Sequence, residues 1–409
     1  MSEYDTLADL FPPDRQPTRE LEPIQKVDKT DQIETDIDEF YETDSAKRVL
    51  KETAAIIAND DVEHRFRYVH ATFGSGKSHL LKLIGVATGE LAGLESYAHE
   101  LANTTSGFKE FREAIADSHI DHLQPLFLNL LDRDRDDTKL PLILYEELGR
   151  RRGYHTDLPW LLEFCWQLDI EHGLWEELQT FEHESLSLAD VVDRPASLRP
   201  WLQQAIPKLE GAADAGLDSP AAVDDRIDAA AEAIDPDAFG PDDLVERLHR
   251  TKRHLERDGD TYEYLIGLDE IAIYVGDQQR RYEEVVDTVT ALIDGLNPPI
   301  LGTGQWPMRD MQQNFLGDVD DNAWFAQEVK LEGADTETIV RKRWLQKSVA
   351  GADHIDTTLL AEAPELDPTL TDDADPPSHN DPVEAYPFRD LDLWLLRDAM
   401  QGLIEGDRD

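Results

Sequence analysis

The chain has 409 residues, of which 88 are acidic and 39 basic, and its formal net charge is −49 at pH 7. This length allows two or three domains, and the single cysteine, Cys165, excludes an internal disulfide and a multi-cysteine zinc site. The longest apolar runs are too short to cross a bilayer, and the acidic N-terminus lacks an export signal, so we expect a cytoplasmic protein with no membrane partner.

The acidic excess runs along the whole chain rather than forming one tail. Self-repulsion of this size would loosen a compact fold in dilute buffer, and concentrated salt would screen it. The composition therefore favours adaptation to a salt-rich cytoplasm, as in halophilic archaea, over mimicry of nucleic acid. High salt also weakens binding that depends on counterion release, which disfavours a broad phosphate-binding surface but leaves a local basic patch open.

Residues 1–44 contain a Phe-Pro-Pro segment and mixed charges, and we expect them to be an extended or partly ordered lead-in. Beyond them, apolar spacing and short apolar runs predict alternating helices and strands. The expected elements, in chain order, are a helix over 45–58, a strand over 65–71, a helix over 79–87, a strand over 123–131, helices over 141–151, 157–176 and 198–209, a strand over 262–274, a helix over 281–295 and a strand over 298–306.

This alternation predicts an α/β domain over 45–310, with a mainly parallel sheet flanked by helices. A mostly helical insertion is expected at about 140–245, within which the Ala- and Asp-rich residues 210–243 are expected to be solvated or loosely packed helices. The C-terminal part is expected to be helical. It comprises a basic helical segment within 311–360, a linker over 361–386 and a helix within 387–409 that would begin a further region.

Cys165 lies in the apolar stretch "LLEFCWQL" and is expected to be a packed thiol.

One motif for phosphate binding lies between the first expected strand and its helix. The segment Ala71-Thr72-Phe73-Gly74-Ser75-Gly76-Lys77-Ser78 matches the P-loop pattern, with Ala in place of the usual first Gly. Its glycines allow successive N–H groups to face an anion, and the N-terminus of the helix favours negative charge there. We expect Phe73, Gly74, Ser75, Gly76, Lys77, Ser78 and His79 to bind ATP phosphates. Lys77 would reach the β- and γ-phosphates and Ser78 would ligate Mg²⁺. A chance match is the alternative, but the strand-to-helix context favours the functional interpretation.

A second pair of candidates ends the strand "YLIGLDE", where parallel sheets place their sites. Asp269 would hold Mg²⁺ through water, and Glu270 would act as the general base that activates the attacking water. An Asp-Glu pair after an apolar strand can also be a solvated strand end, and only the P-loop upstream favours the catalytic role.

Further candidates follow in "LGTGQW" and "TIVRKRWLQKS". Thr303 and Gln305 are expected to sense the γ-phosphate or orient the water, although they could be turn residues without such contact. Arg343, or else Arg341 or Arg309, would neutralise charge on a neighbouring subunit's γ-phosphate. These arginines could equally pair with surrounding carboxylates.

Two motifs that the sequence lacks, and one arrangement that it has, limit which class of nucleoside triphosphatase the chain resembles. No Asn-Lys-x-Asp or Thr-Lys-x-Asp segment exists to bind guanine, and no Ser-Gly-Gly-Gln signature of ABC transporters occurs. The glutamate after the Walker B aspartate, with a polar residue on the next strand, resembles the AAA+ branch of P-loop ATPases, of the ASCE type.

Seven segments carry a narrower resemblance. In chain order they are "LADLFPP", "FGSGKSHLLKL", "PLFLNL", "YLIGLDEIAIYVGD", "ILGTGQ", "RKRWLQKS" and "AYPF", over about residues 5–390. Together they resemble the BrxC/PglY ATPases of BREX phage-defence systems, which are similar to AAA+ proteins. The resemblance implies ATP hydrolysis within a complex that also contains a DNA methyltransferase and a phosphatase-like protein. It implies at most an indirect association with DNA, and an arginine acting in trans would require a homo-oligomer.

Two departures from that family stand out. Its members are usually much longer, so we expect this chain to be an N-terminal portion or one piece of a split gene. Residues 210–243 show no family signal. Two alternatives stay open: an initiator or helicase-loader-like ATPase acting on DNA, and a non-hydrolysing scaffold in which nucleotide only stabilises the fold.

Overall fold

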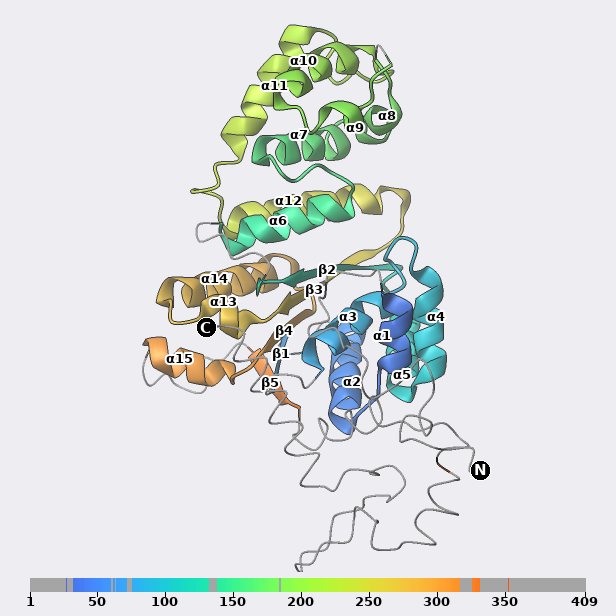
Figure 1. Ribbon diagram of the computed structural model, residues 1–409, viewed down its shortest axis with the longest axis vertical. Helices are drawn as coiled ribbons and strands as arrows, with labels where there is room; N and C mark the ends of the chain where they lie inside the picture. The colour runs from blue at the N-terminus through green and yellow to red at the C-terminus, as the bar shows by residue number, and fades with distance from the viewer. Residues whose placement is uncertain are drawn as a thin grey trace, which may run out of the picture. The chain divides into compact units, whose positions relative to one another are not determined.

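The computed structural model describes residues 27, 32–59, 62, 64–71, 76–131, 138–183, 185–316, 326–331 and 352. Its centre is a parallel β-sheet of five strands flanked by helices, in the order β2-β3-β4-β1-β5 (Figure 1). The strands are β1 (Phe66–His70), β2 (His122–Asn129), β3 (Tyr262–Asp269), β4 (Ile300–Gly304) and β5 (Ala326–Lys330). The expected α/β class and parallel sheet are confirmed.

The chain forms two compact units. The first comprises residues 1–117, 269–273 and 301–409, and the second comprises residues 118–268 and 274–300.

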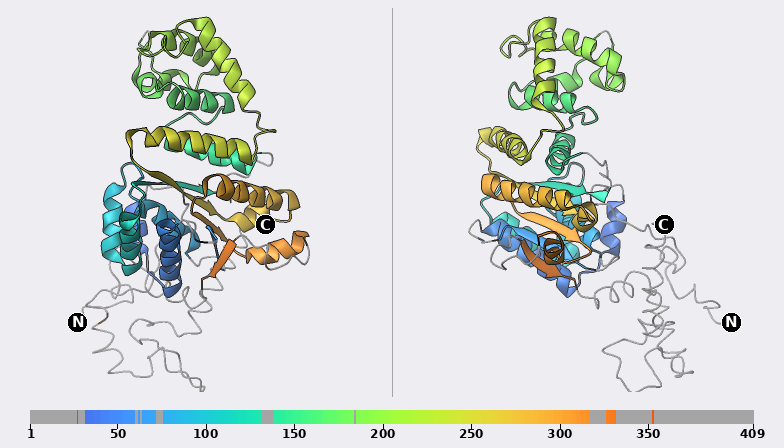
Figure 2. Two further views of the ribbon diagram at one scale, coloured as in Figure 1. Left: turned by 180° about the vertical axis from the view of Figure 1, so that it is seen from behind. Right: turned by 90° about the vertical axis from the view of Figure 1, so that its left-hand side faces the viewer.

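In the first unit, strand β1 is buried along its whole length and pairs in parallel with β5, so that Phe66 lies opposite Ala326 and His70 opposite Lys330. The helices of this unit are α1 (Ile33–Glu39), α2 (Asp44–Ala58), α3 (Lys77–Ala87), α4 (Glu95–Thr104), α5 (Ser106–Asp117) and α15 (Met308–Leu316). Helices α2 to α5, blue to cyan in Figure 2, form one packed group. Helix α2 begins where the Thr43 side chain accepts a hydrogen bond from the Ala46 N–H, an N-cap that its sequence provides.

In the second unit, only helices are described between strands β2 and β3. They are α6 (Leu140–Arg151), α7 (Pro159–Ile170), α8 (Trp175–Thr180), α9 (Leu188–Val191), α10 (Pro195–Ala205), α11 (Pro220–Ala233) and α12 (Pro241–Leu255). After β3 come α13 (Ile271–Val275), which crosses the boundary between the units, and α14 (Gln279–Leu296). Helix α6 packs along α12, and α7 along α11 (Figure 1). The helical character expected for about 140–245 is confirmed.

Helix α11 corrects the expectation of a solvated or loosely packed segment. Val223, Ile227 and Ala230 recur at helical spacing and are almost fully buried. The Ser219 side chain caps the helix and Pro220 occupies its first turn. The segment contains many aspartates, so its narrow apolar face was not recognised in the sequence. That face is enough for packing against α7.

Three other expectations are wrong in part. Strand β3 ends at Asp269 rather than continuing to 274, because Glu270 adopts a left-handed backbone (φ 61°) and helix α13 follows. The helix expected over 157–176 is interrupted, since Gly173 has φ 67° and separates α7 from α8. The segment 311–360 is not purely helical, because it contains β5.

The lead-in expected at residues 1–44 contains helix α1. Ile33 and Ile37 lie one turn apart and are both buried, which explains why this short acidic segment folds against α3. The basic segment 335–349, the linker 361–386 and the helix expected within 387–409 lie outside the described residues. Cys165 is a buried free thiol, as expected, and burial raises its pKa to about 12.

Candidate functional site

The first unit brings together the start of helix α3 and the ends of strands β3 and β4. Strand β1 leads into Ala71, whose N–H donates to the Gly304 carbonyl at the end of β4. Residues 72–75 lie outside the described residues, so Phe73, Gly74 and Ser75 have no structural account. Gly76 precedes α3 with φ 79°, a left-handed conformation that favours glycine. The strand expected before the motif and the helix expected after it are thus confirmed.

Lys77 begins helix α3 and is only 4% exposed. Its ammonium donates a hydrogen bond of 3.0 Å to the Ala71 carbonyl at the other end of the loop. Burial lowers the pKa of Lys77, while the negative charges of Glu270 and Asp269 act in the opposite direction. The side chain therefore places a desolvated cation near two carboxylates.

Ser78 and Thr303 both contact one oxygen of Asp269. The Ser78 hydroxyl donates to Asp269 Oδ1 at 3.0 Å, and the Thr303 hydroxyl donates to the same oxygen at 2.5 Å. Asp269 is fully buried. Three segments far apart in the sequence, α3, β3 and β4, thus meet at one carboxylate.

Glu270 is held by the same threonine. Its backbone N–H donates to Thr303 Oγ1 at 3.1 Å, and its side chain is only 6% exposed. A positive φ is uncommon for a residue other than glycine and is found preferentially at functional turns. The turn directs the chain from β3 into α13 directly after the acidic pair.

The pKa of Asp269 is raised to about 7, because burial and the neighbouring charge of Glu270 disfavour its anion more than the hydrogen bonds of Thr303 and Ser78 and the charge of Lys77 favour it. A divalent cation beside this carboxylate would supply further positive charge. The available donors, a hydroxyl and a carboxylate, are the oxygen ligands that Mg²⁺ accepts.

Within the described residues, no group of three or more His, Cys, Asp or Glu side chains could hold a metal ion. The Ser78 hydroxyl and the Asp269 carboxylate are oxygen donors of the kind that Mg²⁺ takes from proteins, which hold it through one or two carboxylates.

Gln305 follows strand β4 but makes no hydrogen bond to the acidic pair among the described residues. Its amide nitrogen is buried and lacks a hydrogen-bond partner in this part of the chain. A buried amide without a partner is costly, which is consistent with a group kept for a ligand.

The remaining candidates lie apart from this cluster or outside the described residues. His79 Nε2 lies 2.7 Å from the carbonyl oxygen of Asp36 on helix α1, so its side chain is engaged there. The Arg309 N–H donates to Glu328 Oε1 at 2.9 Å. Arg341 and Arg343 lie outside the described residues.

Two interactions that hold the elements of the site together were not predicted from the sequence. Asp36 on α1 forms a buried ion pair of 2.5 Å with Lys82 on α3, the helix that carries Lys77 and Ser78. Tyr68 on β1 donates a hydrogen bond of 3.1 Å to the Trp306 carbonyl, just beyond Gln305. Lys82 lies five residues after the motif lysine, but no local pattern pairs it with Asp36.

No helix of the described residues combines the length and the apolar character needed to cross a membrane.

Comparison with known proteins gives no relative: no family model matches the chain, and no curated protein or solved structure matches it significantly.

Proposed function

We propose that this protein binds and hydrolyses ATP as a P-loop ATPase of the AAA+ type. The observation that carries the proposal is the contact of 3.0 Å between Ser78 and Asp269. It joins the helix that follows the loop to the strand that ends in the acidic pair, as a site with a shared magnesium ion requires. The buried Lys77 lies in the field of both carboxylates.

Each side chain has a role in this proposal. The loop amides and Lys77 bind the phosphates. Ser78 and Asp269 would hold Mg²⁺, which would supply positive charge against the phosphates. A carboxylate oxygen of Glu270 accepts the proton of the attacking water. Thr303 orients the acidic pair, and the Gln305 amide is available to the γ-phosphate or the water.

The wider assignment is also a proposal. The order of motifs supports a cytoplasmic ATPase of a BREX-type phage-defence complex, in which hydrolysis regulates or remodels the complex on DNA. A DNA methyltransferase and a phosphatase-like protein would be its partners, and an arginine such as Arg343 would act between neighbouring copies. Genes for these two partners beside the gene for this chain would support the assignment, and a neighbourhood without them would count against it.

The ATPase itself is tested with two variants and one control in molar KCl. Lys77→Ala is expected to abolish ATP binding measured by calorimetry. Glu270→Gln is expected to bind ATP but to lower phosphate release by roughly a hundredfold or more. Lys109→Ala removes an exposed lysine of the same unit and should change neither quantity.

Two results would overturn the proposal. Wild-type protein without affinity for ATP would remove the nucleotide site, and equal binding by Lys77→Ala would place ATP elsewhere. Binding without turnover, both alone and with the two partner proteins, would instead favour the scaffold.

A further inference from the structure

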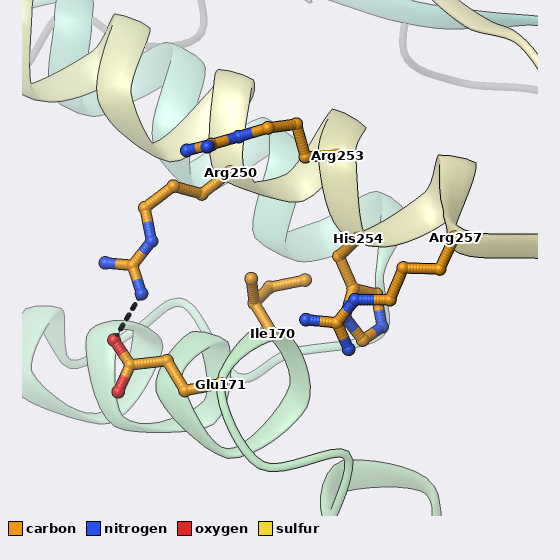
Figure 3. Close-up of a pocket in the computed structure, with 6 residues that line it drawn as sticks. All are labelled: Ile170, Glu171, Arg250, Arg253, His254 and Arg257. Atoms are coloured by element: carbon orange, nitrogen blue, oxygen red, sulfur yellow. Dashed lines mark hydrogen bonds and ion pairs between the residues drawn. The ribbon is translucent and has the colours of Figure 1, made fainter.

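A group of basic side chains lines a pocket in the second unit, on the last turns of helix α12 and the short helical turn after it. Arg250, Arg253, His254 and Arg257 are spaced at i, i+3, i+4 and i+7, so they share one face. The pocket has a volume of about 500 Å³ and is closed on its other side by Ile170 and Glu171 (Figure 3).

The negative charge of the one acidic side chain in this lining is already balanced by arginines. Among the described residues that line the pocket, Glu171 is the one carboxylate. Arg250 contacts one of its oxygens at 2.6 Å and Arg226 contacts the other. Arg253 and Arg257 are exposed and form no hydrogen bond or ion pair within the described part of the chain. Two guanidinium groups without acidic partners are unexpected in a chain whose net charge is −49.

The ends of helices do not account for this charge. Helices α7 and α12 both end beside the pocket, and cations stabilise helix C-termini. Each terminus contributes only about half a negative charge, which falls off within the last turn. Arg250 and Arg226 balance Glu171 and Glu246, the second carboxylate that Arg250 contacts at 3.8 Å. Arg253 and Arg257 remain, and their two charges exceed the two half charges of the termini.

His254 adds a polar atom at the base of the cluster. Its Nδ1 is buried and has no hydrogen-bond partner among the described residues. Burial lowers the pKa of His254, and the charge of nearby Arg257 lowers it further. The hydrogen bond between the ring and the Ile170 backbone acts in the opposite direction, so the ring already has one polar partner beside the unpartnered Nδ1.

We propose that this pocket binds the phosphate groups of a small phosphorylated molecule. Arg253 and Arg257 donate to the phosphate oxygens in the forked geometry that guanidinium groups favour. Seven residues of helix extend over roughly 10 Å, which is long enough for two linked phosphates.

The volume of the pocket is typical of small-molecule sites. A nucleic acid is the weaker candidate, because backbone binding loses affinity steeply in salt and the acidic excess of the chain repels a long polyanion. None of the pocket residues belongs to the candidate nucleotide site, so the proposal is independent of the ATPase.

The test is calorimetric titration with inorganic pyrophosphate in molar KCl. All proteins carry Lys77→Ala, so that the loop does not contribute. The parent is expected to bind, and Arg253→Gln with Arg257→Gln to weaken binding by about tenfold or more. The matched control is Arg194→Gln with Arg280→Gln, which removes two exposed arginines of the same unit and the same charge. It is expected to bind like the parent.

Three outcomes would overturn the proposal. They are no binding by the parent, equal loss in the control, and unchanged binding by the Arg253 and Arg257 variant. Binding of a labelled DNA duplex that is lost in the same variant, without pyrophosphate binding, would assign the pocket to nucleic acid instead. Circular dichroism of all variants checks that they fold.

Discussion

Thr303 donates its hydroxyl proton to Asp269 at 2.5 Å while its oxygen accepts the N–H of Glu270 at 3.1 Å. A hydroxyl has one proton, so while this bond persists Thr303 has none to donate to a γ-phosphate. We therefore expect Thr303 to position the acidic pair rather than to contact nucleotide.

Thr303→Val tests this role, because it keeps the side-chain shape and removes the hydroxyl. It is expected to lower kcat by about tenfold or more, since a general base held loosely reacts poorly. The KM for ATP should change little. Thr303→Ser, which keeps the hydroxyl, is expected to retain most of the activity. A change in KM alone would instead assign Thr303 to nucleotide binding.

Breaking the ion pair between Asp36 and Lys82 is expected to destabilise the first unit. Both side chains are almost fully buried, so Lys82→Met removes the lysine partner of a buried carboxylate at a cost of about 3–5 kcal/mol. Adding Asp36→Leu removes that charge and should restore part of the loss. Urea denaturation checks both variants, and a double variant no more stable than Lys82→Met would contradict the expectation.

Gly304 is expected to tolerate no side chain. A Cβ there would lie 1.8 Å from Tyr68 Oη and 2.8 Å from Tyr68 Cζ. Gly304→Ala must therefore displace a buried ring beside the candidate site, at a cost of about 1–3 kcal/mol. Tyr68→Phe in the same chain removes the nearer atom, so partial recovery of the unfolding temperature is expected. No recovery would show that the ring is not the obstacle.

Cys165 is expected to be inert in the folded protein. Its burial, which raises the pKa to about 12, removes both access and the reactive thiolate. A thiol reagent at mildly alkaline pH should react slowly with native protein and rapidly after denaturation in guanidinium. Fast reaction of the native protein would show that the α7 region opens readily.

Salt is expected to stabilise the fold by screening its acidic charge. The unfolding temperature should rise as KCl is raised from millimolar to molar concentration near neutral pH. Near the isoelectric point of about 4.4 there is little net charge to screen, so the same addition should have a smaller effect. An equal rise at both pH values would assign the stabilisation to salting-out of apolar surface instead.

Most local elements and several residues of the candidate site could be predicted from the sequence. Apolar runs and helical spacing predicted strands β1, β2 and β4 and helices α2, α3, α6 and α14 within a few residues, because neighbours along the chain determine which face is buried. They predicted the start of β3 but not its end. The P-loop spacing predicted Lys77 and Ser78 as site residues, and the acidic pair after the strand predicted Asp269 and Glu270. The packing of α1 and α11 was missed, because their buried faces consist of two or three apolar residues among many acids.

Only the tertiary structure decided which of these residues meet. Ser78 and Asp269 are separated by 191 positions, and their contact depends on α3 and β3 converging at one edge of the sheet. The turn at Glu270, the hydrogen bond from Thr303 to Asp269, and the pairing of β5 with β1 are likewise absent from local patterns. The physical reason is that periodicity reports on burial within one element. Hydrogen bonds and ion pairs between elements depend on distances that only the packed chain defines.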